Sequence, residues 1–148
     1  MQKAVDLRAY RKILVPFDGS PGSEKALRRA LLMAREQGAE VTTYSVDEHV
    51  PRYAPGVGEM EEQKELQQAH LSQLQAKARD VASRQGGKVK TAAEVGHAAQ
   101  CIISFAEQGA FDVIVIGHSG HSGLWGTLLG STTQRVVAHA GCDVLVVR

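Results

Sequence analysis

The 148-residue sequence has no long apolar segment, few aromatic residues (5%) and almost no net charge, +1 with histidine neutral. Its longest apolar runs, such as 113–116 and 144–147, are far shorter than the ~20 residues of a membrane-spanning helix, and residues 1–8 carry charges where a signal peptide would be apolar. Seventeen Lys and Arg against sixteen Asp and Glu form no long block of one sign, which argues against a nucleic-acid-binding or membrane-surface protein. We therefore expect a cytoplasmic protein whose partners are small molecules or other proteins.

Cysteine is also scarce. The two cysteines, Cys101 and Cys142, lack C-x-x-C spacing and lie among apolar neighbours, which predicts free, buried thiols and not a disulfide. A chain of this length buries about two thirds of the surface that its unfolded form exposes, so it can form a full core without metal or disulfide. We expect a single domain.

What the sequence does contain is a regular alternation of short apolar runs with helical patterns. Strands are predicted at 13–17, 40–46, 88–95, 112–116 and 143–147, and helices at 20–37, 59–85, about 98–109 and from 131 onwards. The second helix has a short apolar stripe, which favours a solvated outer face over a coiled coil. The last helix opens with Ser131 and Gln134 in an S-x-x-Q capping box. The last two strands are apolar on both faces, so both should be covered.

Five strands that alternate with helices predict an α/β fold, a single doubly wound parallel sheet with right-handed crossovers and helices on both faces. The flavodoxin-like order 2-1-3-4-5 and the Rossmann-like order 3-2-1-4-5 both suit five strands. In the second order, the first and fourth strands are neighbours whose following connections diverge. That arrangement predicts a ligand crevice between the turn at Asp18 and the loop after Ile116.

A glycine-rich loop, residues 117–131, joins the fourth predicted strand to the last helix and contains five glycines. A helix N-terminus offers unbonded N–H groups and the positive end of a dipole, and glycine lets the main chain approach a bound anion closely. The sequence contains neither a P-loop, G-x-x-x-x-G-K-[ST], nor a dinucleotide fingerprint in the first βα unit. The loop therefore indicates an anion site without a phosphate-binding lysine.

The spacing of this loop is more specific than its glycine content. Gly117, Gly120 and Gly130-Ser131 form the pattern G-x2-G-x9-G-[ST], which resembles that of the universal stress protein family. The other similar segments are 13–20 (ILVPFDGS), 45–48 (SVDE), 129–132 (LGST) and 144–147 (VLVV). The resemblance covers about 11–148, which we take as a universal stress protein domain preceded by an N-terminal extension, 1–10.

The resemblance implies an assembly and a ligand. It implies the strand order 3-2-1-4-5, a cytoplasmic location and a homodimer that pairs through the C-terminal strand, which would cover the apolar residues of that strand. Members with the complete glycine motif resemble ATP binders, so ATP, or AMP or ADP, is the implied ligand. Mg²⁺ would lie on the phosphate oxygens, because only Asp18 offers a nearby carboxylate.

By the same resemblance, the nucleotide is held by four segments of the chain. Residues 16–18 would line the adenosine side, 45–46 would meet the adenine edge, and 117–120 and 130–132 would surround the ribose and phosphates. The residues carried over in this way are Pro16, Phe17, Asp18, Ser45, Val46, Gly117, His118, Gly120, Gly130, Ser131 and Thr132.

Several of these residues allow other interpretations. His118 and His121 are three apart and near Asp18, which suggests a metal site, but no cysteine belongs to a ligand pair, so imidazoles that face solvent or a phosphate are favoured. Ser119 resembles a hydrolase nucleophile, but G-x-S-x-G requires glycine at position 121. Asp18 and Ser131 also have purely structural explanations, as a turn residue and a helix N-cap.

The hypothesis from the sequence is a dimeric, ATP-binding stress-response protein with a regulatory role and an unidentified protein partner. We expect no enzyme, because neither a general base nor a phosphate-activating lysine can be assigned, so any hydrolysis should be slow or depend on a partner. Two alternatives stay open. One is an interaction platform of the same fold that binds no nucleotide, and the other is an adenine-nucleotide hydrolase.

Overall fold

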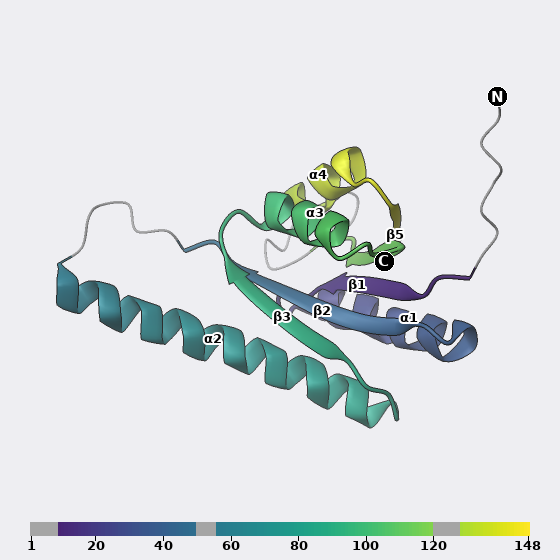
Figure 1. Ribbon diagram of the computed structural model, residues 1–148, viewed down its shortest axis with the longest axis horizontal. Helices are drawn as coiled ribbons and strands as arrows, with labels where there is room; N and C mark the ends of the chain where they lie inside the picture. The colour runs from purple at the N-terminus through teal and green to yellow at the C-terminus, as the bar shows by residue number, and fades with distance from the viewer. Residues whose placement is uncertain (1–8, 50–55, 120–127) are drawn as a thin grey trace.

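A computed structural model of the chain describes residues 9–49, 56–119 and 128–148. Its five parallel strands have the order β3-β2-β1-β4-β5, which confirms the α/β fold and the strand order (Figure 1). In chain order the elements are β1 (Lys12–Pro16), α1 (Pro21–Gln37), β2 (Glu40–Asp47), α2 (Val57–Arg84), β3 (Lys90–Val95), α3 (Ala98–Gln108), β4 (Val113–Gly117), α4 (Ser131–His139) and β5 (Asp143–Val147).

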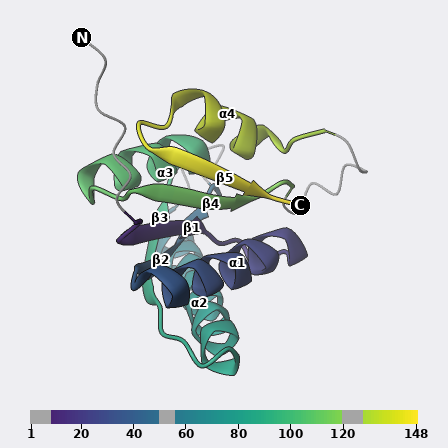
Figure 2. The ribbon, with the colours of Figure 1, turned by 90° about the vertical axis from the view of Figure 1, so that its right-hand side faces the viewer.

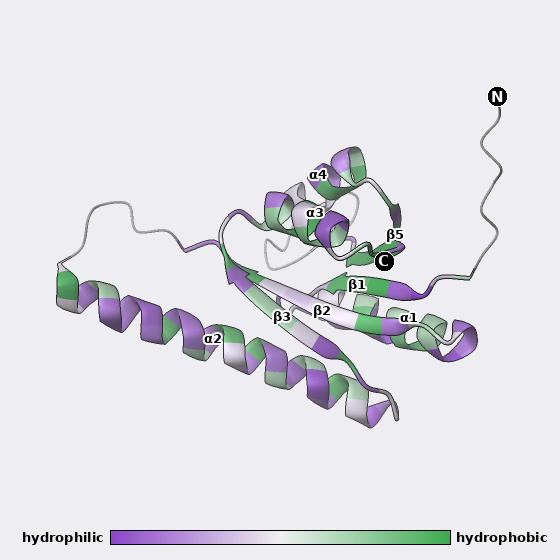
Figure 3. Ribbon diagram, in the orientation of Figure 1, coloured by the Kyte–Doolittle hydropathy of each residue, from purple (hydrophilic) through white to green (hydrophobic). Residues whose placement is uncertain are grey.

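Helices cover both faces of the sheet, α1 and α2 on one face and α3 and α4 on the other (Figure 2). The side chains of β1 alternate between two cores. Ile13 and Val15 lie in the core beneath α1 and α2, and Leu14 lies in the core beneath α3 and α4. β1 and β4 are central strands whose middle residues are fully buried, and Figure 3 shows the hydrophobic stretch of β1 in that position.

The two ends of α1 follow the sequence pattern closely. Ser20 is the N-cap and accepts a hydrogen bond from Ser23 N–H, and Pro21 occupies the first helical position. Gly38 ends the helix with a left-handed φ of +68°, and its N–H donates to Ala34 O. The chain therefore leaves β1 through a short, well-defined turn.

The predicted capping box at the start of α4 is wrong. Gly130 is the N-cap, no described side chain caps the helix, and Ser131 is already helical. The Gln134 side chain donates to Leu129 O at 2.8 Å and does not reach back to Ser131. Gly130 N–H donates to His118 O at 2.9 Å, and this bond places glycine, not serine, at the position before the helix.

α2 is long and is packed only in its C-terminal half. Its buried side chains begin at Leu71 and follow the predicted stripe, whereas the side chain of Leu66, nearer the start of the helix, is 72% exposed. Figures 1 and 3 show the N-terminal half of α2 extending past the sheet with a largely hydrophilic surface. The solvated outer face expected from the sequence is therefore present.

β5 is an edge strand, and its cover is incomplete among the described residues. Leu145 is 38% exposed, so the expectation that this strand is fully covered is not met within one chain. Cys101 and Cys142 are free, as expected, but both are only partly buried. In the part of the chain that the structure describes, no helix is both long and apolar enough to cross a bilayer.

Candidate functional site

A cleft of about 640 Å³ opens at the carboxyl edge of the sheet, where β1 and β4 end and their connections leave toward opposite faces. Eight of the residues expected to bind a ligand line it: Pro16, Phe17, Asp18, Val46, Gly117, Gly130, Ser131 and Thr132. Ser45 and His118 are not part of the lining, and Gly120 lies outside the described residues.

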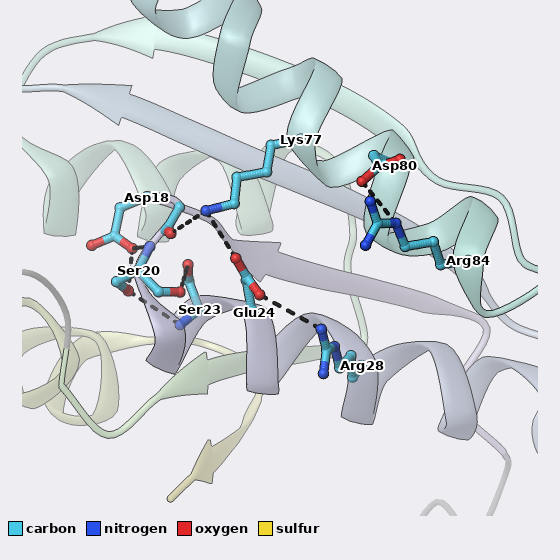
Figure 4. A network of polar contacts seen from close by, with 9 residues as sticks. Asp18, Ser20, Ser23, Glu24, Arg28, Lys77, Asp80 and Arg84 are labelled. Carbon is cyan, nitrogen blue, oxygen red and sulfur yellow. Dashed lines mark hydrogen bonds and ion pairs between the residues drawn. The ribbon is translucent and has the colours of Figure 1, made fainter.

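Asp18 lies in the turn between β1 and α1, and its carboxylate helps to shape that turn (Figure 4). Asp18 Oδ1 accepts hydrogen bonds from the main-chain N–H of Ser20, at 3.0 Å, and from the Ser20 hydroxyl. Ser20 Oγ in turn accepts from Ser23 N–H at 3.2 Å. The carboxylate therefore has a defined position on the wall of the cleft, beside the first turn of α1.

Lys77 of α2 also stabilises this turn. Its Nζ donates to Gly19 O at 2.8 Å and lies 2.8 Å from Glu24 Oε1 of α1 (Figure 4). Gly19 has a φ of +79°, which favours glycine, and a Cβ there would lie 2.9 Å from Leu74 Cδ2. Nothing in the local sequence indicates Lys77, because it reaches the turn from a distant helix.

The end of β2 presents main-chain groups to the cleft. Phe17 N–H donates to Tyr44 O at 2.9 Å, and β1 turns away after this bond. Residues two apart in a strand direct their N–H and C=O to the same side. Val46 is two residues after Tyr44, so its N–H and C=O also point toward the β1 side of β2, but beyond the end of β1. Asp47 O faces β3 and accepts from Gly96 N–H at 2.9 Å. No residue in 9–49, 56–119 or 128–148 bonds to these groups, so Val46 offers a donor and an acceptor to the cleft.

Ser45 has a supporting position behind this edge. Its hydroxyl donates to Phe17 O at 2.6 Å, and the residue is only 1% exposed. The bond joins the last residues of β2 to the turn that carries Asp18. Ser45 therefore acts on the shape of the cleft and does not line it.

Asp47, Glu48, His49 and His70 also line the cleft, although the sequence did not single them out as site residues. Asp47 Oδ1 accepts from His49 N–H at 2.8 Å and lies 2.7 Å from His49 Nδ1. Burial alone would raise the pKa of Asp47, but these bonds and the nearby imidazoles lower it below its usual value. Asp47 and Glu48 could have been identified from the sequence as polar residues at the carboxyl end of a parallel strand. His70 could not, because it comes from α2.

The connection after β4 is held at both ends by main-chain bonds. His118 N–H donates to Val147 O at 2.8 Å, and His118 O accepts from Gly130 N–H. The hydroxyl of Thr133 donates to Gly117 O at 2.8 Å. His118 Nε2 is buried and has no hydrogen-bond partner among the described residues, so this atom faces neither solvent nor the cleft.

Three helices begin at this cleft, and their N-termini differ. Ser20 caps α1, and Glu48 accepts a 2.8 Å hydrogen bond from the N–H of Ala98 at the start of α3. In the described part of the chain, no side chain accepts a capping hydrogen bond at the Gly130 end of α4. Its first N–H groups, at Ser131 and Thr132, therefore form the part of the cleft best suited to an anion.

The charged groups of the cleft include more carboxylates than the sequence suggested. Asp47 and Glu48 line it together with Asp18, which was expected to be the only nearby carboxylate. Within the described ranges, no group of three His, Cys, Asp or Glu side chains could hold a metal ion. His121, half of the alternative histidine pair, lies outside those ranges.

Solved structures of several other proteins have a similar arrangement of helices and strands. The universal stress protein UspA of Lactobacillus plantarum is similar with a TM-score of 0.83 and 29% identity over 97% of this chain and 100% of that chain. A universal stress protein in complex with cAMP has a TM-score of 0.69 and 24% identity over 95% and 98% of the two chains. Complexes of an Archaeoglobus fulgidus protein with dAMP and of an Arabidopsis thaliana protein with AMP, 24% and 16% identical, share the fold with TM-scores of 0.64 and 0.67.

Sequence comparison gives the same result. A universal stress protein of Methanocaldococcus jannaschii is 38% identical over 140 residues, which are 94% of this chain and 82% of the relative. The model of the Universal stress protein family matches residues 9–148. The chain therefore belongs to the universal stress protein family.

Proposed function

We propose that this protein binds ATP, or another adenine nucleotide, in the cleft and acts as a dimeric, cytoplasmic regulator in a stress response. The observation that carries the proposal is the uncapped start of α4 opposite Asp18. N–H groups at Ser131 and Thr132 suit a phosphate, and the Asp18 carboxyl group, which also lines the cleft, suits hydroxyl groups of a ribose.

The remaining parts of a nucleotide have matching groups along the same cleft. The main chain of Val46 offers one donor and one acceptor, which is the pattern that the edge of adenine requires. Gly117, at the end of β4, lets the main chain come close to the sugar and phosphates. Proteins of the same fold have been solved with cAMP, dAMP and AMP, which supports an adenine nucleotide as the ligand.

Mg²⁺ would accompany ATP on its phosphate oxygens, with Asp18 as the carboxylate nearest to that region. Lys77, which is close to this turn, donates to Gly19 O and pairs with Glu24, so it serves the turn and not a phosphate. We accordingly propose a binding function, with hydrolysis slow or dependent on a partner.

The dimer would form through β5. This edge strand pairs with β4 alone among the described strands and has an exposed Leu145, and pairing with the same strand of a second copy would cover its outer side. A regulatory protein partner would then meet a dimer whose two clefts open at the carboxyl edges of their sheets.

Two measurements test the proposal. The purified protein is heated, and the supernatant is examined by chromatography for ATP, ADP or AMP; the nucleotide-free protein is then titrated with Mg-ATP by calorimetry. We expect binding in the wild type and its loss in Gly130→Val, which adds a branched side chain at the N-cap of α4. Gly141→Val is the control, because a Cβ at Gly141 would meet no atom within 4 Å. A wild type that neither releases nor binds nucleotide would favour the interaction platform.

A further inference from the structure

One carboxylate oxygen in the cleft has no hydrogen-bond donor among the residues that the structure describes. Asp47 is only 6% exposed and lines the cleft at the end of β2. Both hydrogen bonds from His49 go to Oδ1, and no described residue donates to Oδ2. Although the residue is largely buried, Oδ2 is not one of the side-chain atoms closed off from solvent, so it is open to the cleft, where a donor from a ligand can replace water.

The position of Asp47 is as informative as its burial. It directly follows Val46, whose main-chain edge faces the cleft beyond the end of β1. A base held by the main chain of Val46 would therefore lie next to Asp47, which lines the same end of the cleft. His70 of α2 and Glu48 complete the charged surroundings of this end of the cleft. An ionised carboxylate only accepts hydrogen bonds, so it favours a base that donates there.

We propose that Asp47 Oδ2 accepts a hydrogen bond from the exocyclic 6-amino group of adenine and so makes the cleft selective for 6-amino over 6-oxo purines. The inference rests on the proposed nucleotide binding and adds the residue that selects the base. Adenine has a donor at position 6, whereas hypoxanthine has an oxygen there that accepts. An oxygen opposite an ionised carboxylate leaves both acceptors without a donor and adds repulsion.

The substitution Asp47→Asn tests this contact with little change in shape. The main-chain N–H of His49 donates to Oδ1, so the amide oxygen of asparagine should keep that position and direct its NH₂ group to the cleft. The cleft would then present a donor where it presented an acceptor. By calorimetry, we expect AMP to bind about tenfold more weakly than to the wild type and the AMP-to-IMP affinity ratio to fall about tenfold.

A control variant separates base recognition from the general effect of removing a negative charge. Asp80→Asn, at an exposed carboxylate on α2, should change neither affinity. Should Asp47→Asn fail to fold, the wild type alone still gives an answer with purine riboside 5′-monophosphate, which lacks the 6-amino group without added bulk. We expect it to bind about tenfold more weakly than AMP.

The outcomes are distinct. A wild type that binds AMP and IMP equally, or an Asp47→Asn variant that weakens both equally, overturns the role of Asp47 but leaves nucleotide binding intact. Equal affinity of the wild type for AMP and purine riboside 5′-monophosphate also overturns it. A wild type that binds no adenine nucleotide overturns the proposed function itself.

Discussion

Gly117 at the end of β4 packs against Gly22 in the first turn of α1, main chain against main chain. A Cβ on Gly117 would lie 2.8 Å from both the carbonyl carbon and the carbonyl oxygen of Gly22, and a Cβ on Gly22 would collide with Ser119 O. Only glycine allows this approach of the two segments that border the cleft. The width of the cleft therefore depends on a pair of residues that present no side chain at all.

Gly117→Ala should damage stability and binding together. The added methyl group must push α1 away from β4, and overpacking of this kind costs about 1–3 kcal/mol of the free energy of unfolding. Denaturant unfolding and calorimetry with Mg-ATP measure the two effects. Gly141→Ala, where the methyl group meets open space, should change stability by no more than about 0.5 kcal/mol. Equal behaviour of the two variants would contradict the close approach.

Lys77→Met should loosen the turn that carries Asp18. The substitution removes the bond to Gly19 O and the ion pair with Glu24, while the apolar part of the side chain is retained. Because Lys77 is half exposed, we expect a loss of only about 0.5 kcal/mol, or roughly twofold in ATP affinity. Arg84→Met is the matched control, since Arg84 pairs with Asp80 within α2 and touches no part of the turn (Figure 4). A twofold loss in both variants would argue against a specific role of Lys77.

The acid sensitivity of the fold should depend in part on Asp47. Its pKa is lower in the folded chain than its ordinary value of 3.8, so ionised Asp47 stabilises the fold above that pH. This contribution is lost as the pH falls through the lower, folded pKa. Urea unfolding between about pH 6 and pH 3 should therefore show a steeper loss of stability in the wild type than in Asp47→Asn. Parallel curves for the two proteins would refute the stabilising role of the ionised carboxylate.

Leu145→Lys should convert the proposed dimer into a monomer. A charge on the exposed edge strand opposes pairing with a second copy of β5. Light scattering after size-exclusion chromatography measures the mass of the assembly. Leu32→Lys places the same charge at a similarly exposed position, 49%, on α1 and should leave the mass unchanged. A Leu145→Lys protein that runs like the wild type would exclude this interface.

Much of the fold could be predicted because its signals are local. β4 and β5 are continuous apolar runs, and the end of α1 carries a glycine at the one position that needs a left-handed residue. The start of α4 could not be predicted in the same way, because the local pattern at Ser131 and Gln134 competes with a long-range bond from Gly130 to His118. Tertiary contact decided which residue became the cap.

The residues of the candidate site also fall into those with a local sequence signal and those positioned by long-range packing. Asp18 and the 130–132 segment belong to a recognisable motif, and the strand order follows from the alternation of elements. Lys77 and Gly22 could not be found from the sequence, because each acts on a segment brought near only by packing. The main chain of Ser45 was expected, together with that of Val46, to meet the adenine edge at the end of β2. Main-chain groups of successive strand residues face opposite sides, so those of Ser45 face β3 and those of Val46 face the cleft.

The separation of the interior into two cores has a practical consequence for anyone who alters this protein. Leu27 lies wholly in the layer beneath α1 and α2, and Ile102 lies in the layer beneath α3 and α4, with the sheet between them. Truncation of either to alanine should cost about 2–5 kcal/mol, and the two costs should add within about 0.5 kcal/mol. One layer can therefore be redesigned, or diversify by mutation, while the other remains as it is.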